Sequence, residues 1–105
     1  MSQDLLDEYA RLLTTDTRAC ADLFSNDAQY LARLGNQDLC FEGRADIGRF
    51  LQHVPRQISF RAASCEPHGA GYQGELSVKC ADLGSRQQRV RFQVQSGRFI
   101  RFEVL

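Results

Sequence analysis

Apolar residues recur at three- and four-residue spacing in two stretches near the start of the chain. The first stripe consists of Leu5, Leu6, Tyr9, Leu12 and Leu13. The second consists of Ala19, Cys20, Leu23 and Phe24. This spacing predicts a helix over residues 3–14 and a second, short helix that ends in the turn-forming run Ser25-Asn26-Asp27. A helical hairpin is therefore expected to open the fold.

The period of the pattern changes to two over residues 28–34, as is typical of a strand with one apolar face. One side of this strand carries Tyr30, Ala32 and Leu34. A turn at Gly35-Asn36 leads to a second short strand over residues 39–42. Gly43 then permits a tight turn into a third helix, which we expect Pro55 to end because a residue before proline disfavours the helical region. The predicted buried face of this helix is Ile47, Phe50, Leu51 and Val54.

Four further stretches alternate between apolar and polar residues, and each is predicted to be a strand with one apolar face. These strands are residues 57–65, 71–83, 87–94 and 98–105. Their apolar positions are Ile58, Phe60, Ala62, Leu76, Val78, Cys80, Val90, Phe92, Val94, Ile100, Phe102 and Val104. The segments between them are rich in glycine and other turn formers, so antiparallel hairpins are expected.

The last hairpin can be checked by parity, because directly opposed residues of antiparallel strands point to the same side. A two-residue loop at Ser96-Gly97 would set Phe92 against Arg101 and mix the two faces. We therefore predict a loop with an odd number of residues, such as a three-residue connection with Gly97 in the left-handed conformation, which keeps the apolar residues of both strands together.

The opposite faces of these strands are polar and charged. They carry Arg61, Glu75, Lys79, Arg89, Arg91, Gln93, Arg101 and Glu103. One interpretation is a solvated sheet face joined by cross-strand charge pairs of small individual energy. A polar homodimer interface is the second interpretation, and a basic ligand-binding patch is the third.

Length and charge limit the classes of function. A chain of 105 residues suits a single domain over residues 1–105 with one core. Thirteen basic residues balance thirteen acidic ones, so no overall field favours nucleic acid or a membrane surface as a partner. No apolar run approaches the roughly 20 residues that span a bilayer, and the first residues lack the pattern of a signal peptide. We expect a cytoplasmic protein.

The four cysteines, Cys20, Cys40, Cys65 and Cys80, are widely spaced and form no C-x-x-C pair. In a reducing compartment they are expected to be small buried hydrophobes. His53 and His68 also fall outside any metal-ligand spacing. The sequence contains no glycine-rich phosphate loop and no Gly-x-Ser-x-Gly motif, so neither a metal nor a cofactor is expected.

The order of these elements resembles the nuclear transport factor 2-like superfamily, which includes ketosteroid isomerase and the SnoaL-like polyketide cyclases. The positions that match its local pattern are Phe24, Asp27, Ala28, Gly43, Arg44, Ile47 and Phe50. Gly97-Arg98-Phe99 is similar to its common final turn. The resemblance implies an α+β fold, a cone-shaped barrel in which a strongly curved antiparallel sheet of about six strands wraps around three helices.

The resemblance also implies a pocket inside the cone. Its lining would be Tyr9, Tyr30, Ala32, Phe50, Leu51, Val54, Phe60, Val78, Phe92 and Phe102. The same bulky residues could instead fill the interior as a packed core, and both alternatives stay open. The main hypothesis is an apolar or aromatic small molecule bound in the cone of a homodimer formed through the sheet. A non-catalytic association domain, with the charged face as its working surface, is a further alternative.

The catalytic pattern of ketosteroid isomerase is an aspartate base with a tyrosine and a protonated aspartic acid. When this pattern is carried over without gaps, the base falls on Ala32, the acidic donor near Arg89 and the tyrosine on Glu8, next to Tyr9. None of the three roles is kept. An isomerase or cyclase would need a non-standard acid or base, for which Tyr30, Glu8 and His53 are the candidates.

Overall fold

The computed structural model describes residues 2–34, 36–55, 57–80 and 84–105, and within these ranges it contains three helices and six strands. The helices are α1 (Ser2–Leu12), α2 (Thr17–Ala21) and α3 (Arg44–Leu51). The strands are β1 (Phe24–Leu34), β2 (Gln37–Glu42), β3 (Ile58–His68), β4 (Gly71–Cys80), β5 (Gly84–Gln95) and β6 (Arg98–Val104). None of the helices in these ranges has the length and apolar character needed to cross a bilayer.

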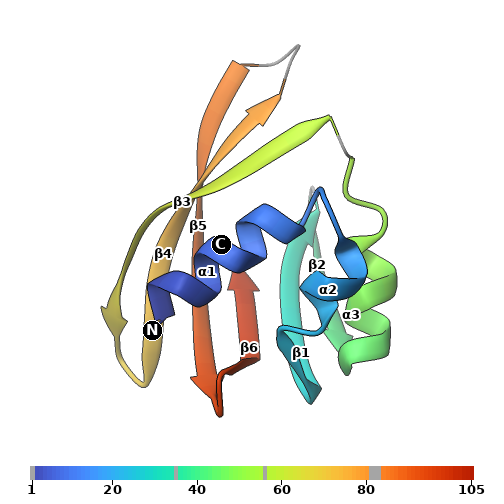
Figure 1. The fold of residues 1–105 in the computed structure, drawn as a ribbon, viewed down its shortest axis with the longest axis vertical. Coiled ribbons are helices and arrows are strands. Elements are labelled where there is room, and N and C mark those ends of the chain that lie inside the picture. The colour runs from blue at the N-terminus through green and yellow to red at the C-terminus, as the bar shows by residue number, and fades with distance from the viewer. Residues whose placement is uncertain (1, 35, 56, 81–83) are drawn as a thin grey trace.

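The six strands form one strongly curved, open sheet in the order β2-β1-β6-β5-β4-β3 (Figure 1). The expected α+β cone is confirmed, but the sheet is mixed, because β1 and β6 run parallel while all other neighbours are antiparallel. Alternation along a strand is the same in both kinds of pairing. The sequence pattern therefore predicts which residues face inward, but it does not predict the direction of the neighbouring strand.

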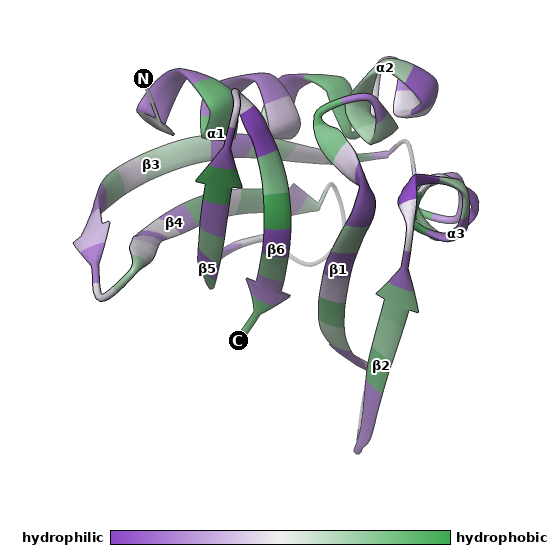
Figure 2. Cartoon of the chain, turned by 90° about the horizontal axis from the view of Figure 1, so that it is seen from below, coloured by the Kyte–Doolittle hydropathy of each residue, from purple (hydrophilic) through white to green (hydrophobic). Residues whose placement is uncertain are grey.

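The helices cover the concave side of the sheet. Figure 2 shows α1 lying over the curved strands β3, β4 and β5, and α3 lying beside β1 and β2. The apolar stripe predicted for α1 is the buried one, with Leu6, Tyr9, Leu12 and Leu13 in the core. The Asp16 carboxylate caps α2 by accepting from the Ala19 N–H at 3.1 Å. These contacts fix the helical hairpin against the inner face of the cone.

Two helix ends differ from the sequence prediction. Helix α2 ends at Ala21, and Phe24 is the first residue of β1, so Ser25-Asn26-Asp27 lies in an irregular strand rather than in a turn. The Phe24 ring is fully buried, and its centroid lies 5.0 Å from that of the Phe99 ring. The backbones of Phe24 and Phe99 are also paired in the sheet. Helix α3 ends at Leu51, well before Pro55. Tertiary packing of Phe24 outweighs its place in the helical spacing.

The β5–β6 hairpin corrects the predicted loop. Its turn has the two residues Ser96 and Gly97, both with positive φ (54° and 75°), as a type I′ turn requires. Parity is restored by an irregularity at Ile100, which lies between the pairs Gln93↔Arg101 and Val94↔Phe99. Phe92 still faces Phe102 as predicted, but Phe99 is buried in place of Ile100.

Strand β5 begins at Gly84, three residues earlier than predicted, so residues 84–86 form strand rather than turn. Strand β3 likewise continues to His68, and Pro67 is accommodated because β3 is an edge strand. The predicted turn residue Gly35 and the end of the predicted strand at residues 81–83 lie outside the described residues. The longer β5 reaches beyond the end of β6.

Gly74 allows α1 to approach the sheet closely. A Cβ at this buried position would lie 2.6 Å from Leu6 Cδ2 and 2.8 Å from the Ser64 carbonyl oxygen. In contrast, a Cβ on Gly48 of α3 would meet only the Ala21 Cβ, at 3.4 Å. The lack of a side chain at Gly74 thus permits a tight contact between α1 and the sheet, whereas Gly48 only makes helix α3 less stable. The two positions can therefore be compared directly by substitution.

We expect Gly74→Ala to lower the free energy of unfolding by about 1–3 kcal/mol, because the new methyl group forces backbone and helix apart. Gly48→Ala should raise it by up to about 1 kcal/mol, since alanine is the better helix former. Urea denaturation followed by circular dichroism measures both. Equal stability of the Gly74→Ala variant and the wild type would contradict the close approach of α1.

Candidate functional site

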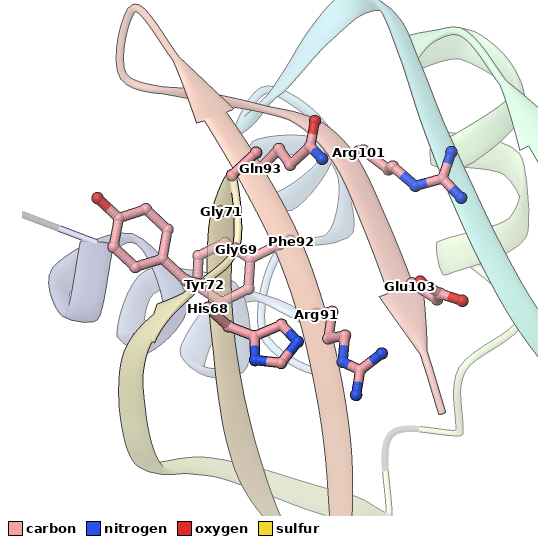
Figure 3. A pocket seen from close by; sticks show the side chains of 10 residues that line it. His68, Gly69, Gly71, Tyr72, Arg91, Phe92, Gln93, Arg101 and Glu103 are labelled. Atoms are coloured by element: carbon pink, nitrogen blue, oxygen red, sulfur yellow. The ribbon is translucent and has the colours of Figure 1, made fainter.

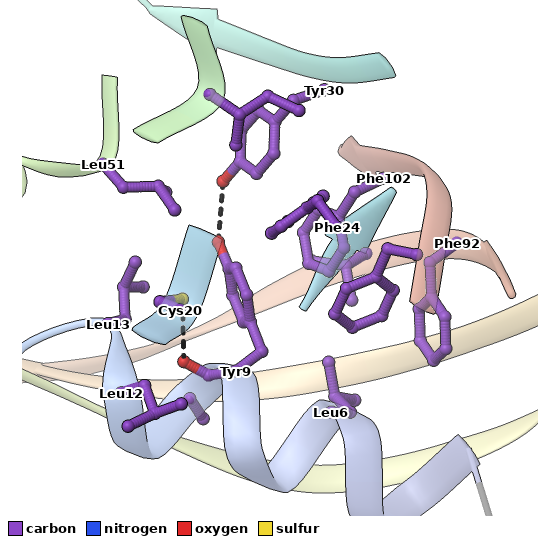
Figure 4. Packing of buried hydrophobic residues seen from close by; sticks show 14 of the residues in the cluster. Leu6, Tyr9, Leu12, Leu13, Cys20, Phe24, Tyr30, Leu51, Phe92 and Phe102 are labelled. Carbon is purple, nitrogen blue, oxygen red and sulfur yellow. Dashed lines mark hydrogen bonds between the residues drawn. The ribbon is translucent and has the colours of Figure 1, made fainter. Parts of the chain in front are cut away.

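Two tyrosines meet at the centre of the cone. Tyr9 comes from α1 and Tyr30 from β1, and their hydroxyl oxygens lie 2.7 Å apart in a hydrogen bond (Figure 4). Both side chains are buried, with 2% and 4% of their surface exposed. A buried hydroxyl requires a partner, and here each tyrosine supplies it for the other. The contact joins the first helix to the first strand.

Aromatic rings pack around this hydroxyl pair. The Phe102 ring lies 4.5 Å from that of Tyr9 and stacks on Tyr30 at 5.2 Å. Phe24, Phe92 and Phe99 complete the cluster, with neighbouring centroids 5.0–6.2 Å apart. Rings at these separations are in direct contact. The deep part of the cone is therefore packed with aromatic side chains.

Burial keeps the groups around the pair neutral. It raises the pKa of Tyr9, and the neighbouring Tyr30 raises it further. Burial also raises the pKa of Tyr30, although the hydrogen bond from Tyr9 opposes the shift. The thiol of Cys20 donates to the Tyr9 carbonyl at 3.7 Å, and burial, together with Asp16, raises its pKa to about 12. At neutral pH these groups are proton donors rather than bases.

The ten residues predicted to line a pocket fall into two sets. The buried set is Tyr9, Tyr30, Leu51, Val78, Phe92 and Phe102. The half-buried set is Ala32, Phe50, Val54 and Phe60. Phe50 joins the two, because its ring lies 5.4 Å from Tyr30 and stacks at 4.4 Å on Phe41, which is also half-buried. A chain of rings thus leads from the core towards the surface.

Phe41 was missed as a site residue, although the hairpin pattern contained the signal for it. It lies directly opposite Tyr30 in the β1–β2 pair, so both side chains point to the inner face. Leu39 is likewise opposite Ala32. The second strand therefore contributes an apolar row to the inner face of the cone.

A hollow of about 310 Å³ opens where β6 ends beside β1 and β2. We call it the mouth hollow. Its lining is Leu31, Ala32, Arg33, Asp38, Leu39, Glu103, Val104 and Leu105. Ala32, Leu39 and Val104 occupy inward-facing register positions, the last because it pairs with the buried Val90. At the rim, the Arg33 guanidinium forms an ion pair with Asp38 at 3.2 Å.

The predicted acid–base candidates lie in different environments. Tyr30 is buried in the hydroxyl pair, whereas Glu8 is exposed on α1 and forms an ion pair with Arg11 at 2.7 Å. His53 is exposed in the turn after α3. Among the described residues, no hydrogen bond joins any two of these three candidates. The structure therefore does not group them into one catalytic arrangement.

All four cysteines are free thiols, and they differ in burial. Cys20 is buried as predicted, and Cys65 and Cys80 are half-buried. The prediction is wrong for Cys40, which is exposed because its register partner Leu31 lies opposite Glu103 on the outer side of the sheet. Within the described ranges, no three His, Cys, Asp or Glu side chains come together as a metal site.

A second hollow, of about 200 Å³, lies on the outer face near the β3–β4 turn (Figure 3). Its lining includes His68, Tyr72, Arg91, Arg101 and Glu103. Arg91 Nε donates to Gln73 at 3.0 Å, and an Arg101 guanidinium N–H donates to Gln29 at 3.0 Å. The predicted cross-strand charge pairs do not form ion pairs in the described part of strands β3–β6, where Arg91 and Arg101 bond to neutral amides instead.

Replacing one tyrosine of the central pair should destabilise the fold more than replacing both. Tyr9→Phe or Tyr30→Phe alone leaves one buried hydroxyl without a partner, which costs about 1–3 kcal/mol. The double variant removes both hydroxyls and should recover much of that loss.

Urea denaturation of the four proteins measures this coupling, and Tyr72→Phe is the control, since the half-buried Tyr72 hydroxyl makes no hydrogen bond with the described residues. If the losses in the free energy of unfolding of the two single variants simply add in the double variant, the two hydroxyls do not depend on one another.

No protein-family model matches the chain, and no curated protein matches it either. The comparison with solved structures, in contrast, finds many similar folds.

Three of these structures illustrate the similarity. A candidate ketosteroid isomerase from Kribbella flavida is 21% identical, with a TM-score of 0.78 over 98% of this chain and 75% of that one. A nuclear transport factor 2-like protein of unknown function from Cytophaga hutchinsonii is 11% identical, with a TM-score of 0.76 over 100% and 88%. A ketosteroid isomerase-like fold from Catenulispora acidiphila, solved with trimethylamine, is 13% identical, with a TM-score of 0.73 over 96% and 83%. This chain therefore has the nuclear transport factor 2-like fold that its sequence resembles.

Proposed function

We propose that the protein binds an apolar or aromatic small molecule at the open end of its cone. The mouth hollow carries this proposal, because Ala32, Leu39 and Val104 meet there at inward-facing positions. Ala32 belongs to the lining predicted from the sequence. In this proposal the ligand lies at the open end of the cone, whereas aromatic rings occupy the deep end.

The dimensions of the mouth hollow favour a small ligand. A cavity of about 150 Å³ accommodates benzene, and ligand pockets commonly begin at about 300 Å³. The hollow, at about 310 Å³, suits a molecule with one or two rings or a short aliphatic chain. Leu39 and Phe41 share the inner face of β2, so the stacked pair Phe41–Phe50 extends the apolar surface next to the hollow.

The comparison also supports a small-molecule site. The Catenulispora acidiphila protein of this fold has been solved in complex with trimethylamine. Five of the eight residues that line the mouth hollow are apolar, namely Leu31, Ala32, Leu39, Val104 and Leu105. Affinity for such a surface comes from buried apolar area.

The ligand proposal predicts that the wild type binds neutral apolar probes such as 2-naphthol and 1-decanol. In NMR titrations, the methyl signals of Ala32, Leu39 and Val104 should shift on binding. Ala32→Leu places a larger side chain in the hollow and should weaken binding at least about tenfold. The control is Ala63→Leu, at an exposed position on β3 outside the hollow.

Two results would overturn the proposal. One is the absence of binding by the wild type at millimolar probe. The other is an affinity that Ala32→Leu leaves equal to that of the Ala63→Leu control, since the bound probe would then lie elsewhere.

We also propose that the outer sheet face forms a homodimer. The register sets Glu75 beside Arg89 and Arg91 beside Glu103, yet neither pair forms an ion pair within the chain. Adjacent opposite charges on one face are self-complementary under the two-fold symmetry of a dimer. A second copy can therefore place its acidic groups against these arginines.

Light scattering should give a mass of twice 11.9 kDa for the wild type. Arg91→Glu reverses one charge of the face and should shift the mass towards 11.9 kDa, because like charges then meet across the two-fold axis. Arg11→Glu, on α1 and away from this face, is the control. A monomeric wild type would rule out the dimer.

A further inference from the structure

Two polar side chains lie on the otherwise apolar inner face of β5. Arg86 is directly opposite Val78, and Gln88 is directly opposite Leu76. Val78 and Leu76 are both buried in the core. Opposed residues of antiparallel strands point to the same side, so Arg86 and Gln88 also point to the concave side.

Arg86 is unusual among the inner-face positions. In the described strand pairs, it is the only charged residue that the register places on this face. The other basic residues nearby, Arg61, Lys79 and Arg89, occupy outer-face positions. The row across the sheet is Phe60, Val78 and Arg86, so Arg86 follows two apolar residues in this row.

The end of β6 leaves this part of β5 accessible from one side. The last backbone contact of β6 with β5 is the Leu105 N–H donating to the Arg89 carbonyl at 2.9 Å. Residues 84–88 pair only with β4. Arg86 is exposed and Gln88 is half-buried, so both can contact a bound molecule.

The mouth hollow lies within reach along the same strand. Val104 lines the hollow and pairs with Val90 of β5. Gln88 and Arg86 follow Val90 on the same face, about 7 Å and 13 Å further along at roughly 3.3 Å per residue. An extended molecule of this length can touch the hollow and Arg86 at once.

We propose that the ligand is an amphipathic carboxylic acid whose carboxylate is bound by Arg86 and assisted by Gln88. This inference rests on the proposed function, and it adds the chemical class of the ligand. The apolar part extends from Arg86 along β5, past Gln88, towards Val104 at the edge of the mouth hollow. Arginine presents a planar pair of N–H donors that matches both oxygens of a carboxylate.

Isothermal titration calorimetry with decanoate and 1-decanol separates the contribution of the ligand's charge to the affinity from that of its alkyl chain. The two probes have the same alkyl chain, and only decanoate carries a carboxylate. The variants are Arg86→Gln, which removes the charge, Arg86→Lys, which keeps it, and Arg89→Gln. The last is the matched control, since Arg89 lies on the same strand but faces outward opposite Glu75.

The wild type should bind decanoate about tenfold or more tightly than 1-decanol. Arg86→Gln should abolish this preference while leaving the affinity for 1-decanol unchanged. Arg86→Lys should retain part of the preference, and Arg89→Gln should retain all of it. Added salt should weaken decanoate binding alone.

Three results would overturn the inference. If the wild type binds 1-decanol but gains nothing from the carboxylate, the apolar site stands and the acid class is wrong. The same holds if Arg86→Gln binds decanoate like the wild type but aggregates more readily, because Arg86 would then protect the open edge of β5. If neither probe binds, the proposed function fails together with the inference.

Discussion

The hydroxyl contact between Tyr9 and Tyr30 constrains the rest of this small fold. It joins a residue of α1 to a residue of β1, and the aromatic cluster packs around it. Each hydroxyl satisfies the other, so two polar atoms can be buried without cost from lost partners. Because the pair lies among large rings, it fixes how closely α1 approaches the sheet, and Gly74 provides the space for that approach.

This central packing also determines where a ligand can bind. The deep end of the cone is filled by aromatic rings and by the two bonded hydroxyls. Burial raises the pKa of both tyrosines, so their hydroxyls stay neutral to a higher pH than that of an exposed tyrosine. The apolar surface that stays partly open lies at the wide end, from Phe50 and Phe41 to the mouth hollow. This partly open surface is where we propose that a small molecule binds.

The sequence predicts the faces of the elements better than their pairing. Alternation correctly places Tyr30, Val78 and Phe102 inside, because burial depends on side-chain period alone. The parallel β1–β6 pair and the irregularity at Ile100 depend on contacts between distant segments, which no local pattern encodes. The same limit applies to the site. Ala32 was predicted, whereas Arg86 was assigned to a turn, since its inward orientation follows from where β5 begins.

The difference in length between β5 and β6 links the fold to the proposed chemistry. Where β6 covers β5, the inner face needs apolar residues such as Val90 and Phe92 to fill the core. Beyond the end of β6, β5 pairs only with β4 in the described part of the sheet. A charged residue on the inner face of this segment can therefore stay exposed. Arg86 lies in this overhang, at the boundary between the apolar interior and water. An amphipathic molecule has the same boundary within its own structure, which is why this end of the cone suits an acid with an apolar chain.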